Sequence, residues 1–110
     1  MTDFYVAVSL NEALRLIDNE IHNSITGETL DRYTAFNDNG RAVVISVYEK
    51  HYYRAGNRLT LTVTADNCSG RTHIHTVGGG GGQGLFRFDW GAGDSFEDCV
   101  TAALRKYIIG

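Results

Sequence analysis

Two histidines separated by one residue are the side chains in this sequence best suited to chemistry. His73 and His75 lie in the stretch RTHIHTV, in which polar and apolar residues alternate. Alternation with a period of two indicates a strand, so both imidazoles are expected on the same face of a sheet. Two imidazoles at this spacing can share a metal ion, but a zinc site needs a third and usually a fourth ligand.

No local spacing supplies the remaining ligands of such a metal site. The candidates are all distant in the sequence: His22, His51, Asp66 and Cys68. The alternative is a polar, solvent-facing surface that the histidines share with Thr60, Thr62 and Thr64 of another alternating strand. We favour the polar surface and keep His73 and His75 as candidate metal ligands.

Five consecutive glycines, residues 78–82, follow the histidines. A phosphate-binding loop needs a Lys-Ser/Thr pair at the start of a helix, and a dinucleotide-binding loop needs a helix directly after its last glycine. Here Gln83 and Gly84 lead instead into the alternating stretch LFRFDW, which is typical of a strand. We therefore predict a connection or bulged crossover between strands, with an anion cradle of backbone amides as the alternative.

A third group of residues combines aromatic and basic side chains in the stretch EKHYYRAGNRLTLTV. Interleaved aromatic and basic residues can bind an anionic ligand or a nucleic-acid strand. The alternative, which we favour, is an irregular connection whose arginines pair with acidic surface residues. If the fold has a ligand site, its expected residues are Tyr53, Arg54, Asn57, Arg58 and Gln83.

Composition restricts the class of protein. The 110 residues are the size of one domain, and 43% hydrophobic with 21% charged residues is typical of a globular chain. A formal net charge of −3 disfavours nucleic acid and anionic membranes as partners. The first residues lack a signal-peptide pattern, and no stretch approaches the roughly 18 apolar residues of a membrane span. Two isolated cysteines then favour a cytoplasmic protein with reduced thiols.

Signatures of nucleophilic catalysis are missing from the sequence. It contains no serine elbow and no motif that places a histidine beside a cysteine. Cys99 falls within an apolar stripe and is most simply a small buried hydrophobic residue. No motif identifies a cofactor, and we expect a non-enzymatic protein rather than an enzyme.

The elements that position these residues follow from two sequence periods. A short apolar run at 3–10 predicts a first strand, and Ser9 with Glu12 forms a capping box that starts an amphipathic helix. Asn39-Gly40 is a strong hairpin signal because both residues tolerate positive φ. Alternation predicts the remaining strands at 29–36, 41–50, 58–65, 71–77 and 85–90.

A second helix closes the sequence. Asp94 and Glu97 form a capping box that predicts its start, with Ser95 and Asp98 as an alternative register. Apolar residues then recur at helical spacing to the end of the chain: Phe96, Cys99, Val100, Ala103, Leu104, Tyr107 and Ile108.

These elements predict a single α+β domain over residues 1–110, in the order β-α-β(4–5)-α. Two helices with one-sided apolar stripes must bury them on one face of the sheet, so we expect a curved antiparallel sheet packed on one face by both helices. The layout resembles the helix-grip and TATA-binding-protein-like folds, which host unrelated functions.

Two stretches resemble a family of short, uncharacterised bacterial proteins of about 110 residues. In YYRAGNRLTLTV, a Tyr-Arg-x-x-Asn-Arg pattern opens an alternating strand. In GGGGGQGLFRFDWGAGDSFEDCV, a glycine-rich segment ending in Gln-Gly precedes an aromatic stretch, although five glycines exceed the pattern. The matching residues are Tyr53, Arg54, Asn57, Arg58, Gln83, Gly84, Phe86 and Phe88. The resemblance implies a bacterial, mainly Gram-positive, cytoplasmic setting and no established activity.

Three functional hypotheses follow. The first is a non-catalytic protein that binds a small, anionic ligand in a pocket between the curved sheet and the C-terminal helix. The second is a homodimer joined through the threonine and histidine face or through an exposed edge strand. The third, ranked last, is a metal-dependent enzyme that uses His73 and His75.

Overall fold

The computed structural model describes residues 2–23, 27–52, 57–80 and 90–109, with the backbone alone for residues 52, 57, 80 and 90–95. The described elements follow one another in this order: β1 (Thr2–Val6), α1 (Leu10–His22), β2 (Gly27–Asp38), β3 (Arg41–Tyr52), β4 (Asn57–Asp66), β5 (Thr72–Gly80), α3 (Trp90–Leu104) and the 3₁₀ turn η1 (Arg105–Tyr107).

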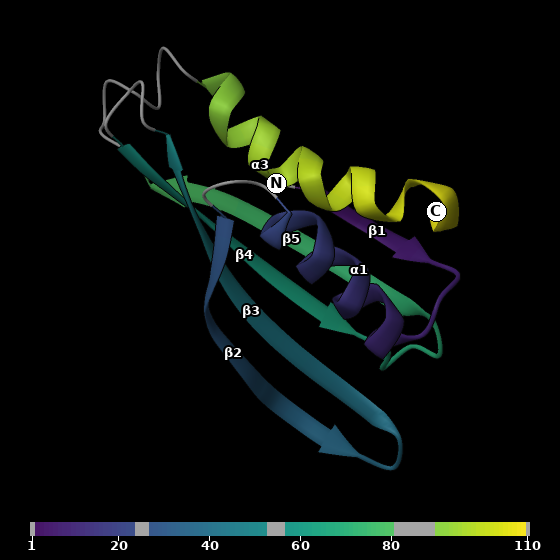
Figure 1. Ribbon diagram of the computed structural model, residues 1–110. Helices are drawn as coiled ribbons and strands as arrows, with labels where there is room; N and C mark the ends of the chain where they lie inside the picture. Colours follow the sequence, from purple (N-terminus) through teal and green to yellow (C-terminus); the bar gives the residue numbers. More distant parts are fainter. Residues whose placement is uncertain (1, 24–26, 53–56, 81–89, 110) are drawn as a thin grey trace.

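The strands form one antiparallel sheet in the order β1-β5-β4-β3-β2. Figure 1 shows α1 and α3 on the same side of this sheet, and the β2–β3 hairpin extends beyond both helices. We call the side that carries the helices the inner face and the opposite side the outer face. The predicted α+β class, an antiparallel sheet packed on one face by two helices, is confirmed.

The hairpin between β2 and β3 forms where the sequence predicts it. Asn39 has φ 52° and Gly40 has φ 79°, the two positive values that a tight hairpin turn of the favoured hand requires. Two irregularities interrupt the pairing of β2 with β3, one between Thr29 and Asp31 and one between Thr34 and Phe36. Both therefore lie in the outermost strand of the sheet.

Helix α1 begins at the predicted cap. The Ser9 hydroxyl accepts a hydrogen bond of 3.2 Å from the Glu12 backbone N–H. The Glu12 carboxylate does not complete the reciprocal half of the box, because it pairs with Arg15 at 2.6 Å. The pattern thus predicted the helix start correctly and the partner of the glutamate wrongly.

Replacing Ser9 with alanine is expected to lower the free energy of unfolding by about 1 kcal/mol, because one helix N–H loses its acceptor. Urea denaturation followed by circular dichroism measures this change. Ser9→Asp restores an acceptor and serves as the control, with stability expected near wild type. Equal losses in both variants would show that the cap contributes nothing.

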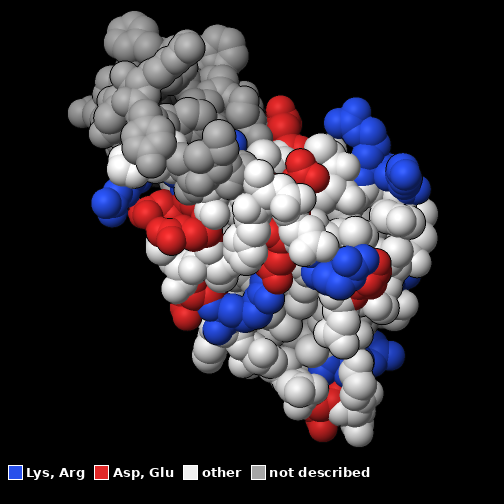
Figure 2. Space-filling view, in the orientation of Figure 1, with Lys and Arg blue, Asp and Glu red and all other residues white. Residues whose placement is uncertain are grey.

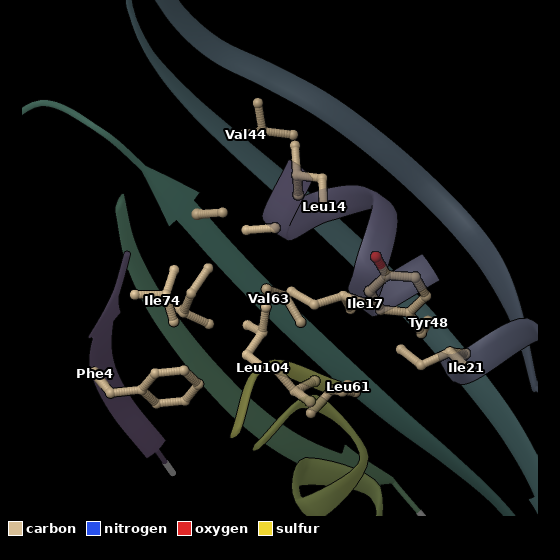
Figure 3. Packing of buried hydrophobic residues seen from close by; sticks show 14 of the residues in the cluster. Phe4, Leu14, Ile17, Ile21, Val44, Tyr48, Leu61, Val63, Ile74 and Leu104 are labelled. Atoms are coloured by element: carbon tan, nitrogen blue, oxygen red, sulfur yellow. The ribbon is translucent and has the colours of Figure 1, made fainter. Parts of the chain in front are cut away.

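The core lies between the inner face and the helices. Figure 3 shows Ile17 and Ile21 of α1 beside Tyr48, with Leu104 of α3 beside Leu61 and Val63 of β4. Each of these side chains is at most 1% exposed. Burial of this kind contributes about 1.5–3 kcal/mol per large apolar side chain, so the helices are held mainly by packing on the inner face.

The predicted start of the connection at Gly78 is wrong. Gly78–Gly80 belong to β5 and pair with Leu61, Thr60 and Leu59, so the first three glycines form strand rather than a connection. Pairing uses only backbone groups, so it continues without side chains. An added Cβ at Gly79 would meet Thr60 Oγ1 at an ordinary 3.5 Å. Residues 81–82 lie outside the described part of the chain.

The last helix starts earlier than its predicted capping box. Helix α3 begins at Trp90, so Asp94 and Glu97 are interior helical residues. Glycines at 91 and 93 lower helix propensity, which made the later start attractive from the sequence. Of the strand predicted at 85–90, residues 85–89 lie outside the described residues and Trp90 is helical.

Candidate functional site

Both described helices lie on the inner face, and the outer face of the sheet is the candidate functional site. Side chains of paired residues share a face, so the register defines which residues lie together on it. Tyr33 pairs with Ile45, Ile45 with Thr64, and Thr64 with His75. One row of the outer face thus runs from the aromatic edge at β2, through a threonine, to a histidine near β1.

The half of the outer face nearest β2 is apolar. On most antiparallel sheets the outer residues are polar, yet Val43, Ile45 and Val47 of β3 are apolar on this side, although Asp31 of β2 pairs with Val47 and also lies there. Tyr33 is 59% exposed, Phe36 47% and Val77 44%. We define the apolar patch as Tyr33, Phe36, Val43, Ile45 and Val47; Val77 of β5 lies apart from it, beyond Thr62 of β4.

The half of the outer face nearest β1 is charged. The two ring nitrogens of His73 contact two carboxylates from different strands: Nδ1 lies 3.0 Å from Asp66 Oδ2 on β4, and Nε2 contacts Asp3 Oδ1 on β1. The His75 Nδ1 atom lies 3.4 Å from the same Asp3 oxygen. We define the polar border as Asp3, Asp66, His73 and His75. The two predicted histidines therefore share a face. Of the three threonines that the polar-surface hypothesis placed opposite them, Thr64 opposes His75, whereas Thr62 opposes Val77 and Thr60 opposes Gly79.

An aromatic and a basic side chain extend the polar border. The Tyr5 ring lies 4.9 Å from the His73 ring, measured between centroids. The Arg71 guanidinium carbon lies 4.4 Å from the Tyr5 centroid, within the range of a cation–π contact. Tyr5 is thus held between two basic groups on the outer face.

Electrostatics favour a protonated His73. Burial would lower the pKa of His73, but hydrogen bonds and charge from Asp66 and Asp3 outweigh it and raise the pKa above its usual 6.5. Burial likewise acts to raise the pKa of the exposed Asp3, and contact with His73 brings it below 3.8. An imidazolium between two carboxylates is therefore the favoured state in mildly acidic solution.

The metal hypothesis gains no support from this arrangement. No group of three or more His, Cys, Asp or Glu side chains among the described residues is arranged to hold a metal ion. His73 contacts a carboxylate through each ring nitrogen, and its raised pKa favours a proton over a metal ion. His73 and His75 as metal ligands stay a prediction.

The residues predicted for an anionic ligand are not brought together in the described part of the chain. Tyr53, Arg54 and Gln83 lie outside it, and of Asn57 only the backbone is described, as the first residue of β4. Arg58 is described: its side chain is 65% exposed and lies 3.9 Å from Glu49. That distant, exposed pair contributes little to stability, as the alternative interpretation expected.

A shallow hollow lies elsewhere, at the opposite end of the sheet from Arg58. It has a volume of about 290 Å³ and is lined by Ser9, Leu10, Asn11, Asn37, Gly40, Ala42 and Asn67. The Asn67 side chain already makes two hydrogen bonds: its Nδ2 donates to the Gly40 carbonyl oxygen, and its Oδ1 accepts from the Ala42 N–H. Beneath α3, by contrast, Phe96, Val100 and Leu104 are at most 1% exposed, so the described part of the predicted pocket region is filled by side chains.

The sequence patterns did not predict that α3 carries a buried carboxylate. Glu97 is 8% exposed and accepts hydrogen bonds from the Thr2 hydroxyl at 2.6 Å, the Thr76 hydroxyl at 3.0 Å and the Gly78 N–H at 3.2 Å. Burial would raise the pKa of Glu97, but these hydrogen bonds lower it below 4.5. The carboxylate thus joins α3 to β1 and β5 in its ionised form.

A second group of hydrogen-bonded side chains that the sequence patterns did not predict joins α1 to the β2–β3 hairpin. The Arg32 guanidinium donates to both Asp18 carboxylate oxygens, at 2.9 and 2.7 Å, and its Nε donates to Ser46 Oγ. The Tyr48 hydroxyl donates to Asp18 at 2.6 Å. Burial, together with the hydrogen bond to Asp18 and its charge, raises the pKa of Tyr48 above 10. The phenol therefore stays neutral and acts as a fixed donor.

The inner side of the molecule shows mixed charge. Figure 2 shows lysine and arginine atoms interspersed with aspartate and glutamate atoms over the visible surface, with a basic group near the end of α3 and η1. This side therefore offers no extended field of one sign for a nucleic-acid backbone. Among the described residues, no helix combines the length and the apolar character needed to cross a membrane.

Both edges of the sheet are obstructed. At one edge, β1 is only five residues long, and the chain near the C-terminus pairs with it: Val6 bridges to Ile108, and the Ala7 N–H donates to Tyr107 O. At the other edge, the two irregularities of β2 distort the row of backbone groups. Short edges and bulges both disfavour pairing with another strand.

Comparison with known proteins gives one match. A family model described as a family of unknown function (DUF6054) matches residues 1–108. No curated protein and no solved structure matches the chain. The expected likeness to short proteins of unknown function is thus confirmed, whereas the bacterial setting and the helix-grip likeness stay predictions.

Proposed function

The chain belongs to the DUF6054 family of unknown function, and we propose that it is a non-catalytic interaction protein that forms a homodimer through the outer face of its sheet. The apolar patch carries this proposal. Contiguous exposed apolar residues on a sheet face are typical of protein–protein contacts. The two aromatic residues, Tyr33 and Phe36, are of a type that is enriched at the centre of such interfaces.

The size of the outer face suits a dimer. The five strands, at about 3.3 Å per residue and about 4.8 Å between strands, span roughly 750 Å². A standard protein interface buries about 800 Å² on each partner. The apolar patch would form its centre, and the polar border would form the charged rim that such interfaces usually have.

The chemistry of the outer face favours a second copy of the chain as the partner. A two-fold axis through the apolar patch sets apolar residues of one copy against the same residues of the other, and the threonines beside them can pair in the same way. The obstructed edges disfavour the alternative, a dimer through strand pairing. Two sheets stacked about 10 Å apart would bury the patch as a sandwich core does.

Replacing Tyr33 with glutamate is expected to weaken the dimer at least about tenfold, or about 1.4 kcal/mol. Each copy would bring a charge to the centre of the contact, and the two charges would repel each other across the axis. Sedimentation velocity over roughly 1 µM to 1 mM protein, a range that spans weak and moderate dimers, measures the change.

The matched control for this experiment is Thr34→Glu. Thr34 is exposed on the same strand, next to Tyr33, but pairs with Val44 on the inner face. The Thr34→Glu variant adds the same negative charge as Tyr33→Glu, and the dissociation constant of its dimer should match that of the wild type. The proposal is wrong if the wild-type protein remains monomeric at the highest concentration, or if both variants weaken the dimer equally.

A further inference from the structure

The outer side of β3 carries charges of opposite sign at its two ends. Every second residue of the strand points outward, which gives the outward series Arg41, Val43, Ile45, Val47 and Glu49. Three residues of the apolar patch thus lie between an arginine and a glutamate. Ile45 is the middle of the series, and each charge lies four residues, or about 13 Å, from it along the strand.

The contacts that these charges make within one copy are weak. The Arg41 guanidinium donates to the Cys68 carbonyl oxygen, which is a neutral acceptor. Glu49 lies directly opposite Glu28 of β2, and like charges in that position destabilise a sheet. Arg58 lies 3.9 Å from Glu49, but its side chain is 65% exposed, so this pair contributes little. Both ends of the series would therefore gain from an opposite charge supplied by a partner.

Two orientations of the copies bring the apolar patches together. If the two-fold axis runs across the strands through Ile45, each strand lies antiparallel on its own counterpart, and the whole outer face is covered. If the axis runs along β3 instead, the order of the strands is reversed, and β5 and β1 extend beyond the contact. The first orientation therefore buries the larger area, closer to that of a standard interface.

We propose that the homodimer is antiparallel and that Arg41 of each copy pairs with the partner's Glu49. This inference rests on the proposed function, because it concerns the same face. The axis through Ile45 sets position 41 opposite position 49 on both sides, so two pairs of opposite charge form. Packed sheets cross at about 30°, which shifts the strand ends by roughly 7 Å, within the combined length of the two side chains. An axis along β3 would set each charge against its own copy.

One contact between like charges accompanies this orientation and identifies it. Asp38 pairs directly with Arg41, so the axis sets Asp38 of one copy near the partner's Glu28. Both side chains are exposed, so the repulsion is small. Asp38→Asn should therefore strengthen the dimer about twofold. An axis along the strands between β2 and β3 would set Asp38 against the partner's Arg41, and the same variant would then weaken the dimer.

Charge reversal tests the pairing of Arg41 with Glu49. Arg41→Glu and Glu49→Arg should each raise the dissociation constant about tenfold, because each variant turns two attractions into two repulsions. The double variant exchanges the two charges and should return to within about threefold of the wild type. The two residues lie about 26 Å apart in one copy, so only contact between copies can restore the affinity. Sedimentation equilibrium at neutral pH measures these constants.

Two controls accompany the reversals. Arg105→Glu makes the same change of net charge as Arg41→Glu but lies in η1, at the end of α3 on the side of the helices, and its dimer should match the wild type. Circular dichroism checks the fold of every variant. If a reversal unfolds the chain, Arg41→Gln and Glu49→Gln remove the attraction alone and should each raise the dissociation constant about threefold.

The outcomes distinguish this inference from the proposed function. A wild-type protein that is monomeric at the highest concentration overturns both. A dimer that Tyr33→Glu weakens, but that the reversals of Arg41 and Glu49 affect no more than Arg105→Glu does, overturns only the antiparallel pairing. A double variant without recovery, or a weaker dimer in Asp38→Asn, likewise overturns the antiparallel pairing and leaves the dimer itself in place.

Discussion

Replacing Glu97 with alanine is expected to lower the free energy of unfolding by about 3 kcal/mol. The change removes the acceptor of two hydroxyls and one backbone N–H, from Thr2, Thr76 and Gly78, in a region that water reaches poorly. A buried donor left without a partner costs about 1–3 kcal/mol, and hydrogen bonds to a charged acceptor are stronger than neutral ones. Guanidinium denaturation at pH 7 measures the loss.

The neighbouring acid provides the control for Glu97. Asp98 is exposed on the same helix, so Asp98→Ala makes the same change of net charge and should alter stability by no more than about 0.5 kcal/mol. Glu97→Gln keeps the size of the side chain but loses the charge, and a loss of about 1–2 kcal/mol is expected. Equal effects of the Glu97 and Asp98 alanine variants would contradict the structural role of Glu97.

The pH dependence of these variants has a defined sign. Because the pKa of Glu97 is lower in the folded protein than its usual 4.5, the carboxylate adds stability above that value and loses its contribution as the pH falls through the folded-state pKa. The difference between wild type and Glu97→Gln should therefore be full at neutral pH and shrink in acid below about pH 4.5.

Replacing Asp18 with alanine is expected to cost about 2 kcal/mol. The Asp18 carboxylate accepts from the Arg32 guanidinium and from the Tyr48 hydroxyl, so its loss leaves a buried phenol without its acceptor and removes the anionic partner of Arg32, which keeps only the neutral acceptors on Ser46 and Tyr48. Breaking a fully buried ion pair costs about 3–5 kcal/mol, and the figure is reduced here because Arg32 is 36% exposed and Asp18 23%. Thermal and urea denaturation give the value.

A double-mutant cycle tests whether the Asp18 group acts as a unit. Tyr48→Phe removes only the phenolic hydroxyl and should cost about 1 kcal/mol alone. In the Asp18→Ala background the same change should cost less, because its acceptor is already gone. Glu20→Ala, an exposed acid on the same helix, is the matched control. Additive losses from Asp18 and Tyr48 would contradict a direct bond between them.

The sequence predicted those parts of the fold that depend on near neighbours. The start of α1 follows from Ser9 and the third residue after it, and the β2–β3 turn follows from two adjacent residues that tolerate positive φ. Strand β4 follows from the alternation of leucine, valine and alanine with threonine. Each signal lies within a few residues, so it can be interpreted without knowing the rest of the chain.

The candidate site could be predicted only in part, because its partners lie far apart in the sequence. Alternation correctly placed His73 and His75 on one face, but Asp3 meets His73 across 70 residues and no spacing records that contact. Asp66 was named only as a distant metal ligand, whereas in the structure it fixes the histidine ring. The apolar patch was missed because β3 is apolar on both faces, which hides its alternation.

The contacts of β1 with distant parts of the chain affect how the protein folds during its synthesis. Strand β1 leaves the ribosome before the other described strands, yet it pairs with β5 some 70 residues later, and the hydrogen bond from Ile109 to Tyr5 forms only after nearly the whole described chain exists. Contacts of such high sequence separation slow folding. The growing chain must therefore keep β1 unpaired until β5 has been made, and the last contact with β1 forms only after translation has passed residue 109.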